Sequence, residues 1–181
     1  MANTSTPRGL VPVRKVSGEY WSGAATLYNV PASYGSALYL GDPMVPTGTS
    51  DANGIPNVTL ATAAGGAYTI GPFIGIVQGG EPITSVTRDL PIYHQASTLQ
   101  RILVADDPDL MFLIEEDGVG GAAGVTASSA NADLVSGTGS TVTGFSGWML
   151  DSSTVNTTNT LQLRILRPWT GSDNDPTLPA A

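Results

Sequence analysis

Short runs of alternating apolar and polar residues extend along most of the chain, and turn-forming residues separate them. Residues 57–62 place Val58 and Leu60 on one face and Thr59 on the other, the period of two of a half-buried strand. Residues 51–54 end in Asn-Gly, which suits a tight hairpin turn before this strand. Alternation, or a short apolar run bounded by turn residues, predicts further strands at residues 25–28, 37–40, 73–77, 100–105, 110–114, 132–135, 140–143, 148–150 and 161–165.

Two of these runs, residues 100–105 and 110–114, are separated by the polar residues 106–109, and this spacing predicts a hairpin. The second run is continuously apolar, so we expect both of its faces to be covered. Residues 92–103 also fit one apolar face of a helix. The β-branched Ile102 opposes a helix, so a loop or a single helical turn followed by a strand is preferred.

The pattern predicts an all-β protein. Ser, Thr, Gly and Pro make up 72 of the 181 residues, and these residues favour turns and caps over helix interiors. We expect a single compact β-barrel or jelly-roll-like sandwich of short antiparallel strands with an extended N-terminal arm, because such folds close or protect strand edges. The expected division is an arm at residues 1–21, a barrel domain at 22–167 and a polar tail at 168–181.

Composition and charge exclude several classes of function. The formal net charge is −8, and such a surface is repelled by a phosphate backbone, so nucleic acid is not an expected partner. The chain has no cysteine, which excludes disulfides and thiolate zinc sites. No apolar run approaches the roughly 20 residues that cross a bilayer, and the first residues lack the apolar core of a secretory signal. We therefore expect a chain that is made in a cytoplasm and has no membrane partner.

No set of residues in the sequence has the pattern of an active site. His94 is the one histidine, and Ser97 lies near it, but the local signature of a nucleophilic serine is absent. Glu115 and Glu116 are adjacent, so in a strand they point to opposite faces and make a poor catalytic pair. The glycine-rich residues 118–123 imitate a dinucleotide fingerprint without a convincing helix after them. We expect no enzyme and no cofactor.

A cluster of acidic residues allows two interpretations. Asp106, Asp107 and Asp109, followed by three more acids at 115–117, could supply the hard oxygen ligands that Ca²⁺ prefers. Their spacing does not match the calcium-loop pattern. A solvated turn that keeps strand edges from pairing is therefore the preferred interpretation, and Asp106, Asp107 and Asp109 remain the candidates if a cation binds.

The first 21 residues differ from the rest of the chain, because they combine basic and apolar residues and hold a single acid, Glu19. Such a segment is either a frayed terminus or an extended arm that orders on a partner. Purely solvating tails lack apolar groups of this kind, and large aromatic residues are typical interface anchors. If the arm binds a partner, the contact residues that we expect are Arg8, Val11, Val13, Arg14, Lys15, Tyr20 and Trp21.

Four segments carry a resemblance to a known family. They are LGDPMVPTGTSDANGIPNVTLATA at residues 40–63, FIGIV at 73–77, ASTLQRILVADDPDLMFLIEEDG at 96–118 and STVTGFSGWMLDSSTVNTTNTLQLRIL at 140–166. Their order resembles that of the structural cement, or decoration, proteins of tailed bacteriophage capsids, over about residues 22–167. The motifs are moderately specific, because none is a catalytic or ligand-binding signature.

The resemblance implies a β-barrel or jelly-roll-like domain on the outer surface of an icosahedral head, with no catalytic residues. The implied function is a non-enzymatic virion protein, made in the host cytoplasm, that stabilises contacts between major capsid protein subunits. The implied partners are the major capsid protein and further copies of the chain, with a dimer preferred over a trimer. The alternative is a tail-fibre or glycan-binding β-sandwich module, since three Trp and six Tyr permit an aromatic sugar site.

Overall fold

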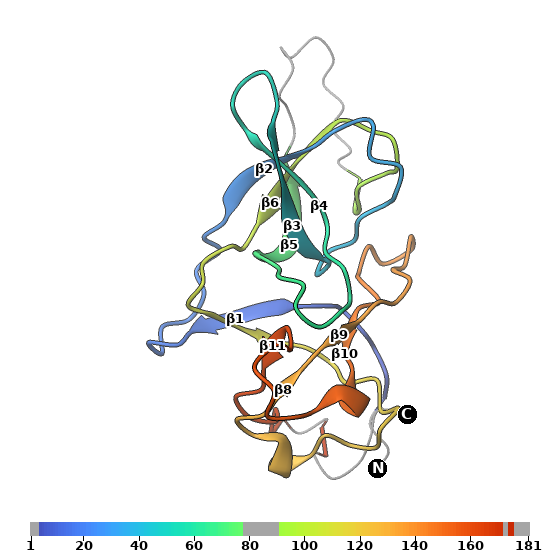
Figure 1. The fold of residues 1–181 in the computed structure, drawn as a ribbon. Coiled ribbons are helices and arrows are strands. Elements are labelled where there is room, and N and C mark those ends of the chain that lie inside the picture. Colours follow the sequence, from blue (N-terminus) through green and yellow to red (C-terminus); the bar gives the residue numbers. More distant parts are fainter. Residues whose placement is uncertain (1–3, 78–90, 172–173, 176–181) are drawn as a thin grey trace.

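The computed structural model describes residues 4–77, 91–171 and 174–175, and within them the chain is mostly β (Figure 1). This part contains no α-helix, and hence no helix long and apolar enough to span a bilayer. Two 3₁₀ turns occur, at Val125–Ala127 and Ser152–Thr154. The strands are β1 (Val11–Lys15), β2 (Thr26–Val30), β3 (Pro43–Ser50), β4 (Pro56–Leu60), β5 (Gly71–Val77), β6 (Gln100–Val104), β7 (Leu110–Leu113), β8 (Asn131–Ala132), β9 (Leu134–Val135), β10 (Met149–Leu150) and β11 (Leu163–Arg164).

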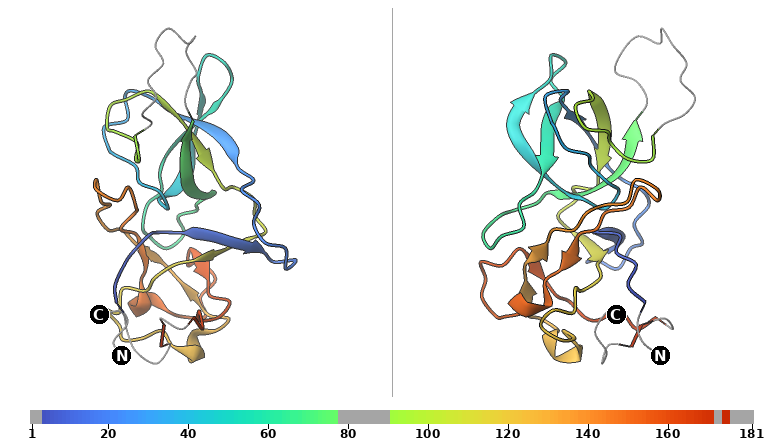
Figure 2. Two further views of the ribbon diagram at one scale, coloured as in Figure 1. Left: turned by 180° about the vertical axis from the view of Figure 1, so that it is seen from behind. Right: turned by 90° about the vertical axis from the view of Figure 1, so that its right-hand side faces the viewer.

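The strands divide between two lobes, which are visible in Figures 1 and 2. The ring lobe contains β2 to β6, which pair in the order β2-β4-β3-β5-β6 and close on themselves. The small-sheet lobe contains three two-stranded antiparallel sheets, β1-β7, β9-β10 and β8-β11. Strand β1 lies where the two lobes meet (Figure 1). The N-terminal segment therefore occupies the junction between the lobes.

The ring is a mixed sheet, which corrects the expectation of purely antiparallel strands. Strands β2 and β4 pair in parallel at a single position, Asn29 with Asn57, and every other neighbour is antiparallel. The Asn29 side-chain amide donates a 2.7 Å hydrogen bond to the Asn57 side-chain carbonyl. This part-buried side-chain bond supplements the single backbone pairing at the closure of the ring.

The hairpin predicted from residues 100–105 and 110–114 is wrong, although both strands exist. Both edges of β6 are occupied, because it pairs with β2 on one side and with β5 on the other. Strand β7 pairs instead with β1. The polar residues 106–109 therefore carry the chain from the ring lobe to the small-sheet lobe.

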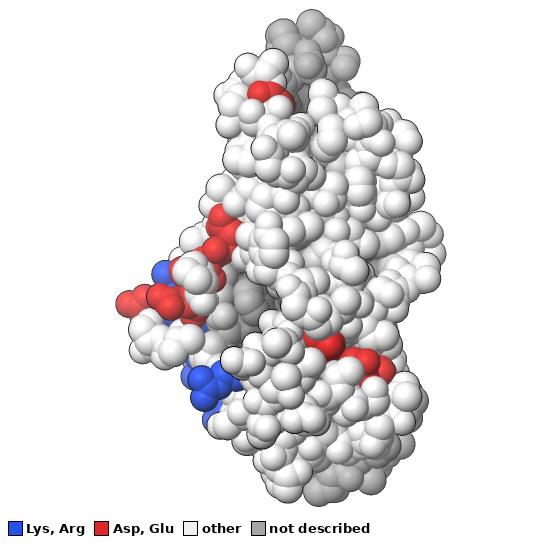
Figure 3. Space-filling model, in the orientation of Figure 1, with Lys and Arg blue, Asp and Glu red and all other residues white. Residues whose placement is uncertain are grey.

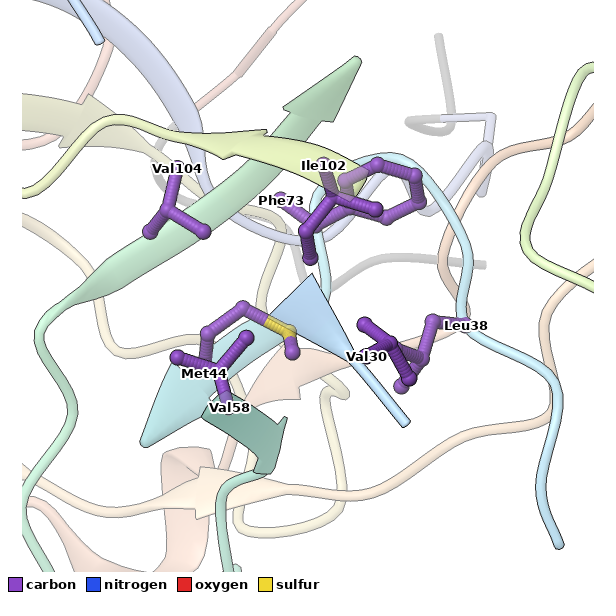
Figure 4. Close-up of a cluster of buried hydrophobic side chains, with 7 residues drawn as sticks. All are labelled: Val30, Leu38, Met44, Val58, Phe73, Ile102 and Val104. Atoms are coloured by element: carbon purple, nitrogen blue, oxygen red, sulfur yellow. The ribbon is translucent and has the colours of Figure 1, made fainter. Parts of the chain in front are cut away.

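The main hydrophobic core fills the ring. Alternate residues of β6, Ile102 and Val104, point inward, as the period of two requires. All members of the core are fully buried (Figure 4): Val30, Leu38, Met44, Val58, Phe73, Ile102 and Val104. Loss of solvent contact by such side chains stabilises a fold by roughly 1.5–3 kcal/mol each, so the ring accounts for much of the stability of the fold.

A second core holds the small-sheet lobe together, and the N-terminal segment belongs to it. Leu10 is 2% exposed and packs with Leu134 and Trp148. Strand β1 follows directly and forms a ladder with β7. Of the segment expected as an extended arm at residues 1–21, residues 10–15 are therefore built into the folded body and the chain turns at residues 16–18, while residues 1–3 lie outside the described residues. Of the tail expected at 168–181, residues 172–173 and 176–181 lie outside the described residues.

Three further strand predictions were wrong or only partly right. Residues 140–143 form a turn, because the Ser140 hydroxyl oxygen accepts hydrogen bonds from the amides of Val142 and Thr143. Residues 37–40 make isolated bridges at Leu38 and Leu40 and no strand. Residues 161–165 alternate well, yet only β11 pairs, since its partner β8 is two residues long.

Candidate interaction surface

The N-terminal segment and the ring together enclose an apolar groove at the junction of the two lobes. The volume of the groove is about 200 Å³. Leu10, Gly41 and Phe73 are buried and form its floor, whereas Val11 is 37% exposed. The full lining is Arg8, Leu10, Val11, Pro12, Trp21, Leu40, Gly41, Phe73, Ile74 and Phe145. Three of the seven expected contact residues, Arg8, Val11 and Trp21, therefore share one surface.

Backbone hydrogen bonds fix the floor of this groove. The Leu10 amide donates to the Gly41 carbonyl oxygen (2.9 Å), and the Gly41 amide donates to the Phe73 carbonyl oxygen (2.7 Å). On the wall, the Trp21 amide donates to the Val13 carbonyl oxygen (3.1 Å). The groove is thus a rigid feature, because its walls belong to paired segments.

Trp21 presents hydrocarbon rather than a polar group to the groove. Its indole N–H donates to the Ala24 carbonyl oxygen at 3.0 Å, and the indole has no other hydrogen-bonding group. The ring is half-buried. An apolar side chain of a partner could pack on it without leaving the indole N–H unpaired.

Arg8 and Phe145 form the rim of the groove. The Arg8 guanidinium lies over the Phe145 ring, 5.1 Å from its centroid, which is within cation–π distance. Phe145 is 37% exposed, and its backbone is held because the Ser140 amide donates to its carbonyl oxygen (2.9 Å). Leu40 continues this contact, since its amide donates to the Gly144 carbonyl oxygen (2.8 Å).

A second hollow of about 340 Å³ adjoins the groove across the Arg8–Phe145 pair, which lines both. The rest of its lining is Thr6, Pro7, Thr138, Ser140, Thr143, Ser146 and Gly147. Several hydroxyl groups therefore join the lining of the second hollow, although most of its lining surface is apolar, as in the first. A ligand that spans both would meet an apolar surface, a cation and several hydroxyls in succession.

A buried carboxylate lies behind this surface. Asp42 is 2% exposed, and its side chain accepts a 2.7 Å hydrogen bond from the Tyr39 amide. Burial raises the pKa of Asp42 to about 6, although hydrogen bonds from the Ser146 hydroxyl and the Tyr39 amide act in the opposite direction. Asp42 therefore links the ring to the 144–147 turn and would change its charge in mildly acidic solution.

Four of the expected contact residues lie along or beyond β1. The Arg14 guanidinium lies 5.4 Å from the centroid of the Tyr20 ring, and Tyr20 is 78% exposed. The Lys15 ammonium forms a 2.7 Å ion pair with Asp107. Val13 is half-buried in the strand. In Figure 3, the basic side chains and one group of acidic ones lie on the left, further acidic side chains appear at the top and at the lower right, and most of the face shown carries no charge.

Two of the three candidate cation ligands, Asp106 and Asp107, have side-chain partners within the protein. Asp106 accepts hydrogen bonds from the hydroxyls of Thr26 and Tyr28, both at 2.8 Å. Asp107 binds Lys15 and also accepts from the Asp109 amide (2.9 Å). Within the described part of the chain, no group of three His, Cys, Asp or Glu side chains is arranged to hold a metal ion. The structure thus gives the carboxylates of Asp106 and Asp107 partners within the protein, whereas Asp109 takes part through its backbone amide.

His94 lies in the ring lobe and is fully buried. Its Nδ1 is 3.0 Å from the Gln100 side-chain oxygen, and burial lowers the pKa of the imidazole. Its Nε2 has no hydrogen-bond partner among the described residues. Ser97, the residue considered as a nucleophile, does not hydrogen-bond to the imidazole in this part of the chain, and its amide donates to the Tyr34 carbonyl oxygen. His94 is therefore placed as a residue of the interior.

The sequence alone did not point to half of the groove. Leu40, Phe73, Ile74 and Phe145 come from segments outside residues 1–21; the first three lie in ordinary apolar runs and Phe145 follows a turn. Phe145 between Gly144 and Ser146 is an aromatic residue outside any predicted strand, but nothing in its own segment places it beside residue 8. No protein-family model, curated protein or solved structure significantly matches this chain.

Proposed function

We propose that this chain is a non-enzymatic virion protein that binds the outside of an icosahedral phage head and stabilises contacts between major capsid protein subunits. The sequence resemblance over residues 22–167 to capsid cement proteins supports this proposal, with the ring lobe as the small β-barrel of such a protein. The observation that carries it is the groove beside the N-terminal segment, which is apolar, rigid and rimmed by a cation.

The physical mechanism is linkage between binding and assembly. A protein that binds the assembled shell but not its separated subunits stabilises the shell by mass action. The groove suits this task, because its shape is fixed by backbone hydrogen bonds before a partner arrives. Little ordering would then be needed on binding, and less of the binding free energy would be lost.

The test is co-sedimentation of the purified protein with intact heads that have been stripped of it, together with the rupture temperature of the heads. Saturable binding that raises the rupture temperature is the expected result. Absence of binding to correctly expanded heads would overturn the proposal. A glycan array on the same protein then examines the glycan-binding alternative.

Point substitutions are better suited to this test than truncation. Removing residues 1–18 would delete Leu10 from the second core and β1 from its ladder with β7, so loss of binding could reflect unfolding. Trp21→Ala removes a wall of the groove, and we expect it to weaken binding to heads. Trp169→Ala is the matched control, since Trp169 is 47% exposed and is not part of the groove lining.

A further inference from the structure

We propose that the groove and the adjoining hollow bind an extended acidic segment of the partner protein, with an apolar side chain in the groove and a nearby Asp or Glu carboxylate on Arg8. This proposal deepens the proposed function by naming the chemistry of the partner. It rests on two adjoining hollows that share Arg8 and Phe145, the second of which adds several hydroxyl groups to a mostly apolar lining.

Charge complementarity identifies the occupant. Among the described residues the ion pairs are Lys15 with Asp107 and Arg101 with Asp51, and Arg8 belongs to neither. Arg8 is exposed, so it presents a local positive charge on a protein whose net charge of −8 otherwise repels an acidic partner. A carboxylate on the partner would therefore find at Arg8 a cation whose charge no described carboxylate neutralises.

The stacking of Arg8 on Phe145 prepares the guanidinium for such a partner. The guanidinium lies 5.1 Å from the ring centroid and pairs with no described carboxylate, and its N–H donors match a carboxylate in a two-pronged arrangement. The contact with Phe145 also restricts the arginine side chain, so less conformational freedom is lost on binding. A lysine would supply the charge without the matching fork of donors.

The second hollow adds donors on the same side. The Ser140 hydroxyl oxygen accepts bonds from the Val142 amide (3.3 Å) and the Thr143 amide (3.2 Å). The Thr143 hydroxyl oxygen accepts from the Phe145 amide (3.4 Å). Each hydroxyl proton is therefore left to donate to a further acceptor, and both residues line the hollow. Backbone carbonyls and a carboxylate of an extended segment are acceptors of the right kind.

The groove determines what lies beside the carboxylate. Leu10 and Phe73 form a buried floor, and Val11, Trp21 and Ile74 form walls that offer no free donor. A charged or strongly polar side chain placed there would lose hydration without a partner. The segment should therefore carry a leucine-like side chain next to its acidic residue.

The experiment measures binding of the full chain to stripped heads with substitutions at Arg8. We expect Arg8→Gln to weaken binding about 10- to 100-fold, the effect of one hydrogen-bonded charge pair. Arg8→Lys should recover part of the loss, and Arg8→Glu should abolish binding. Arg164→Gln, which removes an exposed cation from β11, is the matched control and should bind as wild type. Unchanged unfolding temperatures would show that the variants remain folded.

The outcomes separate this proposal from the proposed function. If wild type and Arg8→Glu bind heads equally, the acidic-segment proposal is overturned while the cement function stands. If wild type fails to bind heads, the cement function fails, and a random-sequence peptide library decides the present proposal. Selected peptides that combine Asp or Glu with Leu, Ile or Phe and are lost with Arg8→Glu would support it. Selection of peptides without acidic enrichment, or of no peptides at all, would overturn it. So would the finding that the chain binds further copies of itself and that Arg8→Glu breaks this self-association.

Discussion

The backbone of Gly9 crosses the backbone of Gly41 with no room for a side chain on either residue. A Cβ atom added to Gly9 would overlap the Gly41 carbonyl oxygen, and one added to Gly41 would overlap the Arg8 carbonyl oxygen. Both residues also have positive φ angles, +67° and +96°. This crossing brings the N-terminal segment against the ring, and the floor of the groove follows from it.

The crossing predicts that Gly9→Ala and Gly41→Ala each lower the free energy of unfolding by at least about 3 kcal/mol, from steric overlap added to left-handed backbone strain. Gly48→Ala is the control, since its φ is +77° and a Cβ there would meet nothing within 4 Å. It should cost only about 1 kcal/mol of strain. Urea unfolding of the three variants checks this, and equal losses at Gly9 and Gly48 would contradict the close crossing.

Asp42 predicts an unusual dependence of stability on pH. Burial raises its pKa to about 6, above the value in the unfolded chain, so the folded state binds the proton more tightly. The contribution of Asp42 to stability is then greatest below about pH 4 and is lost as the pH rises through about 6. The size of this loss is about 3 kcal/mol, taking 1.36 kcal/mol per pKa unit.

Asp42→Asn isolates this effect, because the amide does not titrate. As the pH rises from 4 to 7, the free energy of unfolding of wild type should fall by about 3 kcal/mol relative to that of the variant. Urea unfolding of both proteins across this range measures the difference. A constant difference would show that the Asp42 carboxylate does not titrate abnormally.

His94 should act in the opposite direction to Asp42. Burial lowers the pKa of the imidazole below 6.5, so the unfolded chain takes up a proton more readily than the folded one. The contribution of neutral His94 to stability is present above the unfolded pKa and is lost as the pH falls below about 6.5. His94→Gln should therefore gain stability relative to wild type between pH 7 and pH 5. A histidine exposed to solvent would give no such change.

The tip of the β3–β4 hairpin depends on Asp51. Its Oδ1 atom accepts hydrogen bonds from the amides of Asn53 (2.8 Å) and Ile55 (2.9 Å), and its Oδ2 atom lies 3.3 Å from the Arg101 guanidinium. The hydrogen bond from the Ile55 amide has the largest effect on the pKa of Asp51. Together with the bond from the Asn53 amide and the charge of Arg101, it holds this pKa below its usual value. Asp51 therefore stabilises the fold at neutral pH, and this contribution is lost as the pH falls below about 4.

Two substitutions separate the parts of this contribution. Asp51→Asn keeps an acceptor for the amides and loses the charge, so it should lower the unfolding temperature less than Asp51→Ala. Both variants should approach wild type in acid, because the Asp51 carboxylate is then protonated. Thermal unfolding at pH 7 and pH 3 measures this order. Equal effects at both pH values would show that the ionised carboxylate makes no contribution.

Local pattern was a good guide where a strand buries one face in the ring. Residues 57–62, 73–77 and 100–105 each predicted the strand that the structure contains. Alternation, or a short apolar run between turn residues, can be recognised from a few neighbouring positions. Pattern failed for residues 140–143, where the Ser140 hydroxyl oxygen takes the amides that a strand would have paired. The pattern also failed to predict which strands pair, as in the expected hairpin of residues 100–105 and 110–114, because the order of strands depends on contacts between distant segments.

The candidate site was also predictable only where its residues are neighbours in the sequence. Arg8, Val11 and Trp21 were expected to meet a partner because basic, apolar and aromatic residues share a short segment. Leu40 and Phe145 could not be foreseen, as nothing in their own segments sets them beside residue 8. Lys15 has the same charge as Arg8, yet its ion pair with Asp107 gives it a structural partner.

The sequence by itself determined that the chain is rich in short strands and turns, because side-chain period and turn residues act over a few neighbouring positions. It also excluded disulfides and thiolate metal sites, because composition does not depend on folding. Only the tertiary structure decided that β6 lies between β2 and β5, and that β1 pairs with β7. The groove arises from the same cause, since the crossing of Gly9 and Gly41 joins segments about thirty residues apart and brings Phe145 beside Arg8.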